Sequence, residues 1–151
     1  MNVMILLIYY IMFLKRNTDM NYTILDSSDQ MKFEDIVRLL RMTYWAKERP
    51  EETIRKSLQN SSCYGICLEG TDRLIGFARV ISDYATSYYI CDVIVDPEYQ
   101  HKGLGTALLS HIESVPDFAG LRGFLITRDA QDFYRRFGYE VVNDRIMVKA
   151  T

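Results

Sequence analysis

The residues best placed to do chemistry form a glycine-rich turn, Gln100-His101-Lys102-Gly103-Leu104-Gly105-Thr106, between a strand-like apolar run and a helix-like segment. Glycines let successive backbone N–H groups converge on one point at the start of a helix. Such groups, together with the positive end of the helix dipole, bind phosphate oxygens. The turn therefore predicts a site for a phosphate-bearing ligand, and a tight turn without a ligand is the alternative.

Two familiar phosphate motifs do not fit this turn. A dinucleotide fingerprint needs a further glycine at position 108, where Leu108 stands. A P-loop needs a Gly-Lys-Ser or Gly-Lys-Thr sequence, which the chain lacks. The ligand is therefore expected to be neither a dinucleotide of that class nor a nucleotide held by a P-loop.

A second candidate group lies on the strand-like run that precedes the turn. Asp92 interrupts the apolar sequence of residues 88–95, where a carboxylate is costly to bury unless it is hydrogen-bonded or used in chemistry. Two interpretations stay open, a carboxylate that binds or activates an amine and a purely structural one. Asp83, Tyr84 and Tyr88 surround the preceding turn and offer an acid and aromatic surface to a cation.

Composition bounds the class of protein. The 151 residues include 18 basic and 20 acidic side chains, a net charge of −2, which is typical of one globular domain and not of a nucleic-acid-binding protein. Two histidines and three cysteines stand in no arrangement typical of a metal site or a catalytic triad. An odd number of cysteines in apolar surroundings favours a reducing compartment, and we expect a cytoplasmic protein.

The N-terminus is the one anomaly in composition. Residues 3–14 are apolar and are followed by Lys15 and Arg16. As a helix these residues would cover about 18 Å, too little for a hydrocarbon core about 30 Å thick, and the charge order is the reverse of a secretory signal. We expect residues 1–19 to be an apolar N-terminal extension and residues 20–151 to be a single domain. The extension is interpreted as a packed element, a dispensable tail or a peripheral membrane anchor; spanning the membrane is not expected.

Alternation of apolar patterns predicts an α/β chain with a mixed sheet and helices on its faces. Short turns between residues 63 and 95 predict an antiparallel meander. The strands are expected at 22–25, 63–68, 74–81, 88–95, 124–126 and 146–148, and the helices at 32–41, 50–59, 104–112 and 130–137.

Two motifs together resemble a known family. Gln100-x-x-Gly103-x-Gly105 resembles the acetyl-CoA signature of the GNAT superfamily, the general-control-type N-acetyltransferases, and residues 130–139 (AQDFYRRFGY) resemble its second signature. The resemblance runs from Met20 to the C-terminus, and two motifs at the expected separation are more specific than either alone. The chain departs from the pattern at His101, where many members have glycine, and at Thr127, where many have asparagine.

The resemblance implies a twisted mixed sheet that is splayed between its fourth and fifth strands, with acetyl-CoA in the opening and CoA as a product. It implies that the pantetheine arm pairs with main-chain groups near Val95, one of whose N–H groups would stabilise the oxyanion, and that Tyr134 is the general acid. Asp92 is the second catalytic candidate. The cofactor-binding residues implied are Val93, Ile94, Val95, Gln100, His101, Lys102, Gly103, Leu104, Gly105 and Thr106.

The function implied is an acetyl-CoA-dependent N-acetyltransferase that acts on a primary amine of a small molecule or a peptide by direct attack on the thioester. The alternative is a catalytically degenerate domain that binds acyl-CoA as a sensor or interaction module. A homodimer stays open, and no motif in the sequence names the acceptor amine.

Overall fold

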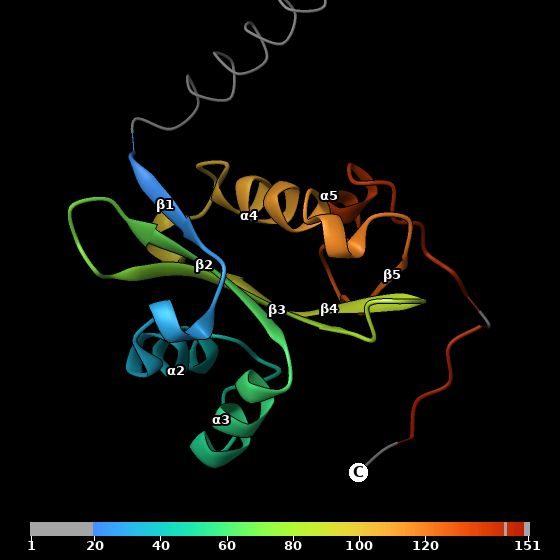
Figure 1. Cartoon of the computed structure of the whole chain (residues 1–151), viewed down its shortest axis with the longest axis horizontal. Coiled ribbons are helices and arrows are strands. Elements are labelled where there is room, and N and C mark those ends of the chain that lie inside the picture. Colours follow the sequence, from blue (N-terminus) through green and yellow to red (C-terminus); the bar gives the residue numbers. More distant parts are fainter. Residues whose placement is uncertain (1–19, 144, 150–151) are drawn as a thin grey trace, which may run out of the picture.

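A five-stranded sheet with helices on both faces forms the fold (Figure 1). The computed structural model describes residues 20–143 and 145–149. The strands are β1 (Tyr22–Leu25), β2 (Ser62–Leu68), β3 (Leu74–Ser82), β4 (Ser87–Val95) and β5 (Arg122–Leu125). The helices are α2 (Phe33–Arg41), α3 (Glu51–Gln59), α4 (Leu104–Glu113) and α5 (Gln131–Arg135), with short 3-10 turns η1 (Ser28–Gln30), η2 (Pro97–Tyr99) and η3 (Pro116–Phe118).

The strands follow one another across the sheet in chain order. Strands β1 to β4 form the predicted antiparallel meander, and β5 then pairs with β4 in parallel. The β4–β5 register begins at Ser87↔Arg122 and ends at Ile90↔Leu125. Residues 91–95 of β4 therefore extend beyond the last pair, which confirms the splayed mixed sheet.

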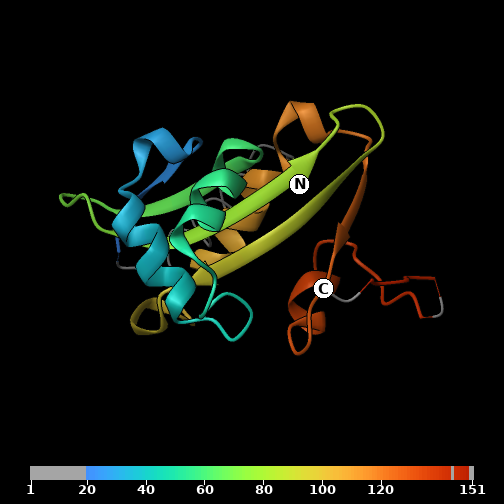
Figure 2. The same ribbon diagram turned by 90° about the horizontal axis from the view of Figure 1, so that it is seen from below.

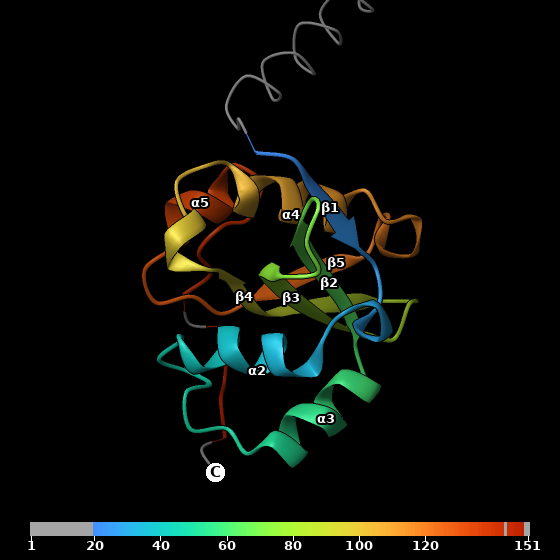
Figure 3. The same cartoon turned by 90° about the vertical axis from the view of Figure 1, so that its left-hand side faces the viewer.

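Two helical layers cover the sheet. Helices α2 and α3 lie on one face, and α4 and α5 lie on the other (Figure 3). Leu104, Leu108 and Leu109 of α4 are buried with the apolar side chains of one face. The opposite face packs against α2, and Ile54 of α3 is fully buried there. The helices form as predicted because their apolar residues recur at helical spacing and point to the sheet.

A bulge in β4 changes which side chains face which layer. Arg79 of β3 pairs with Cys91 and Phe77 pairs with Ile94, so β4 holds one extra residue between these pairs. Asp92 lies at this point with φ of 56°, in the left-handed region. Before the bulge Tyr88 and Ile90 face the α4 layer; after it Val93 and Val95 do, and Ile94 faces α2.

Several expectations about the C-terminal part and the N-terminus need separate comment. The strand predicted at 146–148 is wrong, because Arg145–Lys149 are exposed and irregular, with Met147 99% exposed. An apolar triplet forms a strand only where another strand offers hydrogen-bonding partners, and the pattern itself names none. The fifth strand spans 122–125 rather than 124–126, and α5 ends at Arg135. The N-terminal extension, residues 1–19, lies outside the described residues.

Candidate active site

Strands β4 and β5 diverge beyond their last pair, Ile90↔Leu125 (Figure 2), so the residues of β4 after Ile90 do not pair with β5 and form one wall of an opening. The Asp96 N–H donates to Ile75 O of β3 at 2.8 Å. Because strand residues alternate in direction, Ile94 also points its N–H and C=O to β3, whereas Val95 points them away from β3. The Val95 carbonyl accepts a hydrogen bond from Gln100 Nε2 at 3.0 Å. Val95, and Val93 by the same alternation, therefore offer main-chain groups to a ligand in the opening.

The glycine-rich turn lies at the end of this wall and starts α4. Gly103 is the N-cap of α4 with φ of 79°, and His101 also has a positive φ, 61°. The Ala107 N–H donates to Gly103 O at 2.9 Å and is the first hydrogen bond of the helix. The N–H groups of Leu104, Gly105 and Thr106 precede it and have no partner within the helix. Three donors and the helix dipole thus suit an anion here.

Positive side chains flank the start of α4. Lys102 Nζ lies 5.3 Å from the centre of the Tyr99 ring, and Arg136 Nη2 of the segment after α5 lies 3.5 Å from Thr106 Oγ1. Motif spacing did not single out Arg136, because the contact joins residues 30 positions apart. The two cations add to the potential that favours a phosphate.

Gly105 has a different role from the one that its place in the motif suggests. A Cβ at Gly105 would lie 3.6 Å from Phe133 Cζ and 3.8 Å from Val95 Cγ2, at ordinary contact distance. This position faces protein and not an open cradle. The packing of α4 against β4 and α5 therefore leaves room for a single methyl group at Gly105, and the group that this residue offers to a ligand is its backbone N–H.

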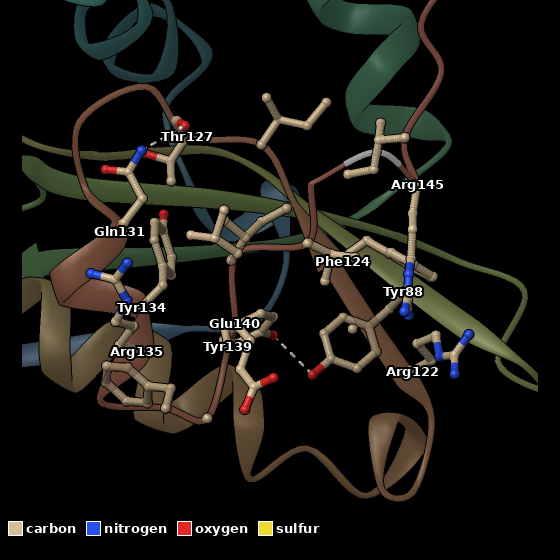
Figure 4. Close-up of a pocket in the computed structure, with 18 of the residues that line it drawn as sticks. Tyr88, Arg122, Phe124, Thr127, Gln131, Tyr134, Arg135, Tyr139, Glu140 and Arg145 are labelled. Atoms are coloured by element: carbon tan, nitrogen blue, oxygen red, sulfur yellow. Dashed lines mark hydrogen bonds between the residues drawn. The ribbon is translucent and has the colours of Figure 1, made fainter.

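Tyr134 of α5 is 9% exposed and packs edge-on against Phe133, with ring centres 5.0 Å apart. Figure 4 shows its hydroxyl beside Thr127 and Gln131, at the C-terminal end of β5. Burial raises the pKa of the Tyr134 phenol to about 12. The hydroxyl therefore keeps its proton throughout the neutral range.

Thr127, the residue that departs from the family pattern, bonds to the residue that precedes α5. Its Oγ1 accepts a hydrogen bond from the N–H of Ala130, the N-cap of α5, at 3.0 Å. The bond fixes the turn that leads into the helix that carries Tyr134. Threonine at this position thus has a local structural use.

Asp92 points to the α2 side of β4 and is engaged by two arginines. Arg49 contacts both carboxylate oxygens, Nη1 to Oδ2 at 2.7 Å and Nη2 to Oδ1 at 3.0 Å, and Arg79 Nε contacts Oδ2 at 2.9 Å. Burial opposes ionisation, but the hydrogen bonds and charges of Arg49 and Arg79 outweigh it and lower the pKa of the Asp92 carboxyl. The catalytic role of Asp92 stays a prediction, and this geometry favours the structural interpretation.

The structure does not bring Asp83, Tyr84 and Tyr88 to the opening; they lie at the other end of β4. Asp83 accepts hydrogen bonds from Thr86 Oγ1 and from backbone N–H groups of its own turn, which lower its pKa. Tyr84 stacks on Phe118 at 6.0 Å. The Tyr88 hydroxyl lies within hydrogen-bond distance of Glu113 and Tyr139. Each side chain is thus used in local structure.

A cavity of about 760 Å³ lies between β5, α5 and the segment that follows α5 (Figure 4). Its lining joins Tyr134 and Thr127, near the opening, to the Tyr88–Tyr139 pair at its other end. The Tyr139 hydroxyl donates to Glu113 Oε1 at 2.6 Å. The residues that follow Gly138 form no motif or regular pattern, so the sequence did not predict this cavity.

An aromatic surface that the sequence did not indicate lies on the α2 side. Tyr44 and Trp45, in the segment after α2, are 56% and 43% exposed and pack edge-on with ring centres 4.9 Å apart. Arg128, which follows β5, lies with its guanidinium carbon 3.8 Å from the centre of the Tyr44 ring. The contact joins the α2 side of the molecule to the end of β5.

Metal sites and membrane-spanning helices are both absent from residues 20–143 and 145–149. Within these residues, no group of three or more histidine, cysteine, aspartate or glutamate side chains is arranged to hold a metal ion. No helix of this part combines the length and the apolar character needed to cross a bilayer.

A mixed sheet splayed between parallel β4 and β5, with a helix start at the mouth of the splay, defines the class of acetyltransferase-like α/β domains. The model of the acetyltransferase (GNAT) family matches residues 33–139. The chain therefore belongs to the GNAT acetyltransferase family, as the two sequence motifs predicted.

Individual relatives agree with this assignment. A GNAT-family protein from Xanthomonas campestris, known from its crystal structure, is 33% identical in sequence to this chain. The two structures superpose with a TM-score of 0.80 over 87% of this chain and 94% of the other. "Histone acetyltransferase TAP1" of Glycine max is 33% identical over 78% of this chain and 55% of its own length. "GCN5-related N-acetyltransferase 2, chloroplastic" of Arabidopsis thaliana is 41% identical over 45% of this chain. This chain spans 55% and 27% of these two curated relatives.

Proposed function

We propose that the protein is an acetyl-CoA-dependent N-acetyltransferase acting on a primary amine, with Tyr134 as general acid. One observation carries the proposal: the β4–β5 opening joins the main-chain edge near Val95 that points away from β3, the N–H groups that start α4 and the protonated Tyr134 phenol. Each matches one part of an acetyl thioester of CoA, namely the pantetheine amides, the pyrophosphate and the sulfur.

The residues present fit acetyl-CoA as a substrate. The N–H groups of Leu104, Gly105 and Thr106 would receive the pyrophosphate, with Lys102 and Arg136 adding positive charge. Displacing the Gln100 side chain from the Val95 carbonyl would free that carbonyl for a pantetheine amide. When bound, acetyl-CoA supplies an activated acyl group.

Acyl transfer places three demands on the protein. An alkylammonium, with an ordinary pKa of about 10.4, must lose a proton before its nitrogen attacks the carbonyl carbon. A backbone N–H near Val95 would then stabilise the oxyanion as the C–N bond forms. As the C–S bond breaks, the sulfur takes the Tyr134 proton and leaves as the CoA thiol. The nitrogen releases its proton to water, and the Tyr134 phenolate regains a proton from solvent before the next turnover. Asp92 is too fully engaged by its arginines to be our choice for the amine proton.

The acceptor is proposed to be a primary amine of a peptide or a small molecule, and a protein lysine is the first to test. The soybean relative is named a histone acetyltransferase, and this similarity supports testing a histone peptide as the acceptor. The exposed Tyr44 and Trp45 rings offer aromatic surface on which an ammonium or an apolar stem would lie. The Arabidopsis relative is named chloroplastic, so a cytoplasmic location stays a prediction.

The experiment is to incubate the full chain with acetyl-CoA and a panel of amines, and to measure acetylated product and free CoA together by mass spectrometry. The panel contains histone-tail peptides, N-terminal peptides and small alkyl and aryl amines. We expect stoichiometric CoA and acetylamine for at least one acceptor. Calorimetric acetyl-CoA binding without product for any amine would contradict the enzyme and identify an acyl-CoA-binding module instead.

A further inference from the structure

The Asp92 cluster connects three segments that are distant in the sequence. Arg49 comes from the segment that links α2 to α3, Arg79 from β3 and Asp92 from β4, and the two ion pairs span 43 and 13 residues. Arg79 Nη1 also donates to Ser61 Oγ at 2.9 Å, just before β2. The cluster therefore anchors the aromatic segment after α2 to the middle of the sheet.

The cluster is centred on the residue whose backbone makes the bulge. Asp92 has φ of 56°, in the left-handed region that residues other than glycine adopt infrequently. The carboxylate is 3% exposed, and both of its oxygens are bonded to guanidinium groups. Bonds that fix the side chain in this direction also hold the backbone that carries it.

The bulge decides what the opening presents. It lies one residue after the last position at which β4 is still aligned with β3 in its first register, Cys91↔Arg79. Beyond it, the parity of the strand is reversed, so Val93 and Val95 place their side chains on the α4 layer. Without the extra residue, every side chain from Val93 onward would turn to the opposite face.

We propose that Asp92 is a positioning residue. Its ion pairs with Arg49 and Arg79 hold the backbone of the β4 bulge in place, and the bulge points the main-chain groups of Val93 and Val95 into the opening. The inference rests on the proposed function. It gives Asp92 the role of holding the strand in position instead of the role of a base that removes the amine proton. It also assigns Arg49 and Arg79, which touch neither the turn nor Tyr134 in the structure, a part in the reaction.

Arginine variants separate positioning from proton abstraction. If Asp92 were the base, Arg49→Gln would leave a freer and more basic carboxylate, and kcat would hold or rise. If Asp92 positions the strand, Arg49→Gln and Asp92→Asn lower kcat in the same direction, by about 10- to 100-fold, because a displaced oxyanion donor loses much of the 10²–10³-fold effect of a removed one. Arg49→Lys, which keeps the charge, recovers part of the loss.

The measurements are kcat and KM for both substrates, calorimetric Kd for CoA, and amide NMR shifts of residues 93–95. We expect the Kd for CoA to rise by a smaller factor than kcat falls, because the phosphate donors at the start of α4 stay in place while the pantetheine contacts at Val93 and Val95 shift. The amide shifts should move in both variants. Asp35→Asn is the matched control: Asp35 also bonds an arginine, Arg38, and a backbone N–H, but lies on α2 away from the bulge. It should lower the melting temperature and leave kcat within twofold.

The outcomes are distinguishable. A wild-type protein without turnover on any amine counts against the proposed function, and unmoved 93–95 amide shifts in the folded variants would then overturn the positioning role as well. An active wild type with unchanged kcat in Arg49→Gln and Asp92→Asn overturns the positioning role alone. Should Asp92→Asn fail to fold, Arg49→Gln decides, because Arg49 keeps 22% of its side chain exposed and its loss leaves Arg79 on the carboxylate.

Discussion

Replacing Gly103 by alanine tests the phosphate cradle with little interference from packing. Gly103 has φ of 79°, and a Cβ there would meet nothing within 4 Å. The substitution therefore adds backbone strain and no clash. A left-handed conformation costs an alanine about 1–2 kcal/mol, offset in part by about 0.4–1 kcal/mol from the loss of freedom in the unfolded chain.

In the free protein the strained turn would relax and rotate the N–H groups away from their shared point. Strain that the free protein loses by relaxing must be restored on binding, so the Kd for acetyl-CoA should rise, by at most about 5- to 30-fold, the equivalent of the full 1–2 kcal/mol. Strain that the free protein keeps lowers the melting temperature instead, by at most about 3–4 °C for a net loss of about 1 kcal/mol. Titration calorimetry and thermal unfolding measure the two effects.

Gly70 provides the matched control. It has φ of 77°, also with nothing within 4 Å of a Cβ, and it lies in the β2–β3 turn, far along the chain from α4. Gly70→Ala should lose a similar stability and leave the Kd unchanged. If both variants lose the same stability and neither changes the Kd, the turn at Gly103 does not bind the pyrophosphate and the reasoning is refuted.

Three further predictions follow from single contacts. Gly105→Ala should hold or gain stability, because its Cβ meets Phe133 at 3.6 Å, whereas Gly105→Val should lose about 1–3 kcal/mol by overpacking; urea unfolding that ranks the two the other way would contradict this. Because the pKa of Tyr134 is raised to about 12, kcat should rise with pH as the amine loses its proton and show no fall before about pH 10; a fall with a midpoint near 8 that Tyr134→Phe abolishes would contradict it. Burial opposes ionisation of Asp96, but hydrogen bonds from Arg38 and the Glu98 N–H lower the pKa of its carboxyl. The stabilisation that Asp96 gives the folded state is therefore present above the ordinary carboxyl pKa of about 3.9 and is lost as pH falls below it. Asp96→Asn should make the urea midpoint depend less on pH between 2.5 and 5, and an unchanged dependence would count against the pairing.

Most of the sheet and its helices could be predicted because local apolar periodicity determines them. The meander and the helix after the turn follow from patterns within the elements and from the short turns between them, whereas the place of the fifth strand beside the fourth was implied by the family resemblance. The turn at 100–106 and Tyr134 were found through motifs. These parts of the site are formed by residues that lie close together in the sequence, and a motif can therefore identify them.

The rest of the site depends on contacts that no local pattern records. The bulge at Asp92 reverses the alternation of side chains in a strand whose sequence is one apolar run interrupted by a carboxylate, and Arg49, which binds that carboxylate, stands 43 residues away. The Arg128–Tyr44 contact joins two loops that show no periodicity. The predicted strand at 146–148 failed for the same reason, since apolar residues without a partner strand stay irregular.

The rate of acetyl transfer in Tyr134→Phe tests the central claim most directly. The variant removes one hydroxyl from a buried ring, and Tyr139→Phe, 6.1 Å away between ring centres, removes another from the same neighbourhood. Single-turnover rates with saturating acetyl-CoA should fall about 10²–10⁴-fold in Tyr134→Phe and stay within threefold of wild type in Tyr139→Phe, with acetyl-CoA Kd unchanged in both. A wild-type rate in folded Tyr134→Phe would show that another group protonates the sulfur and would contradict the assignment of this opening's general acid.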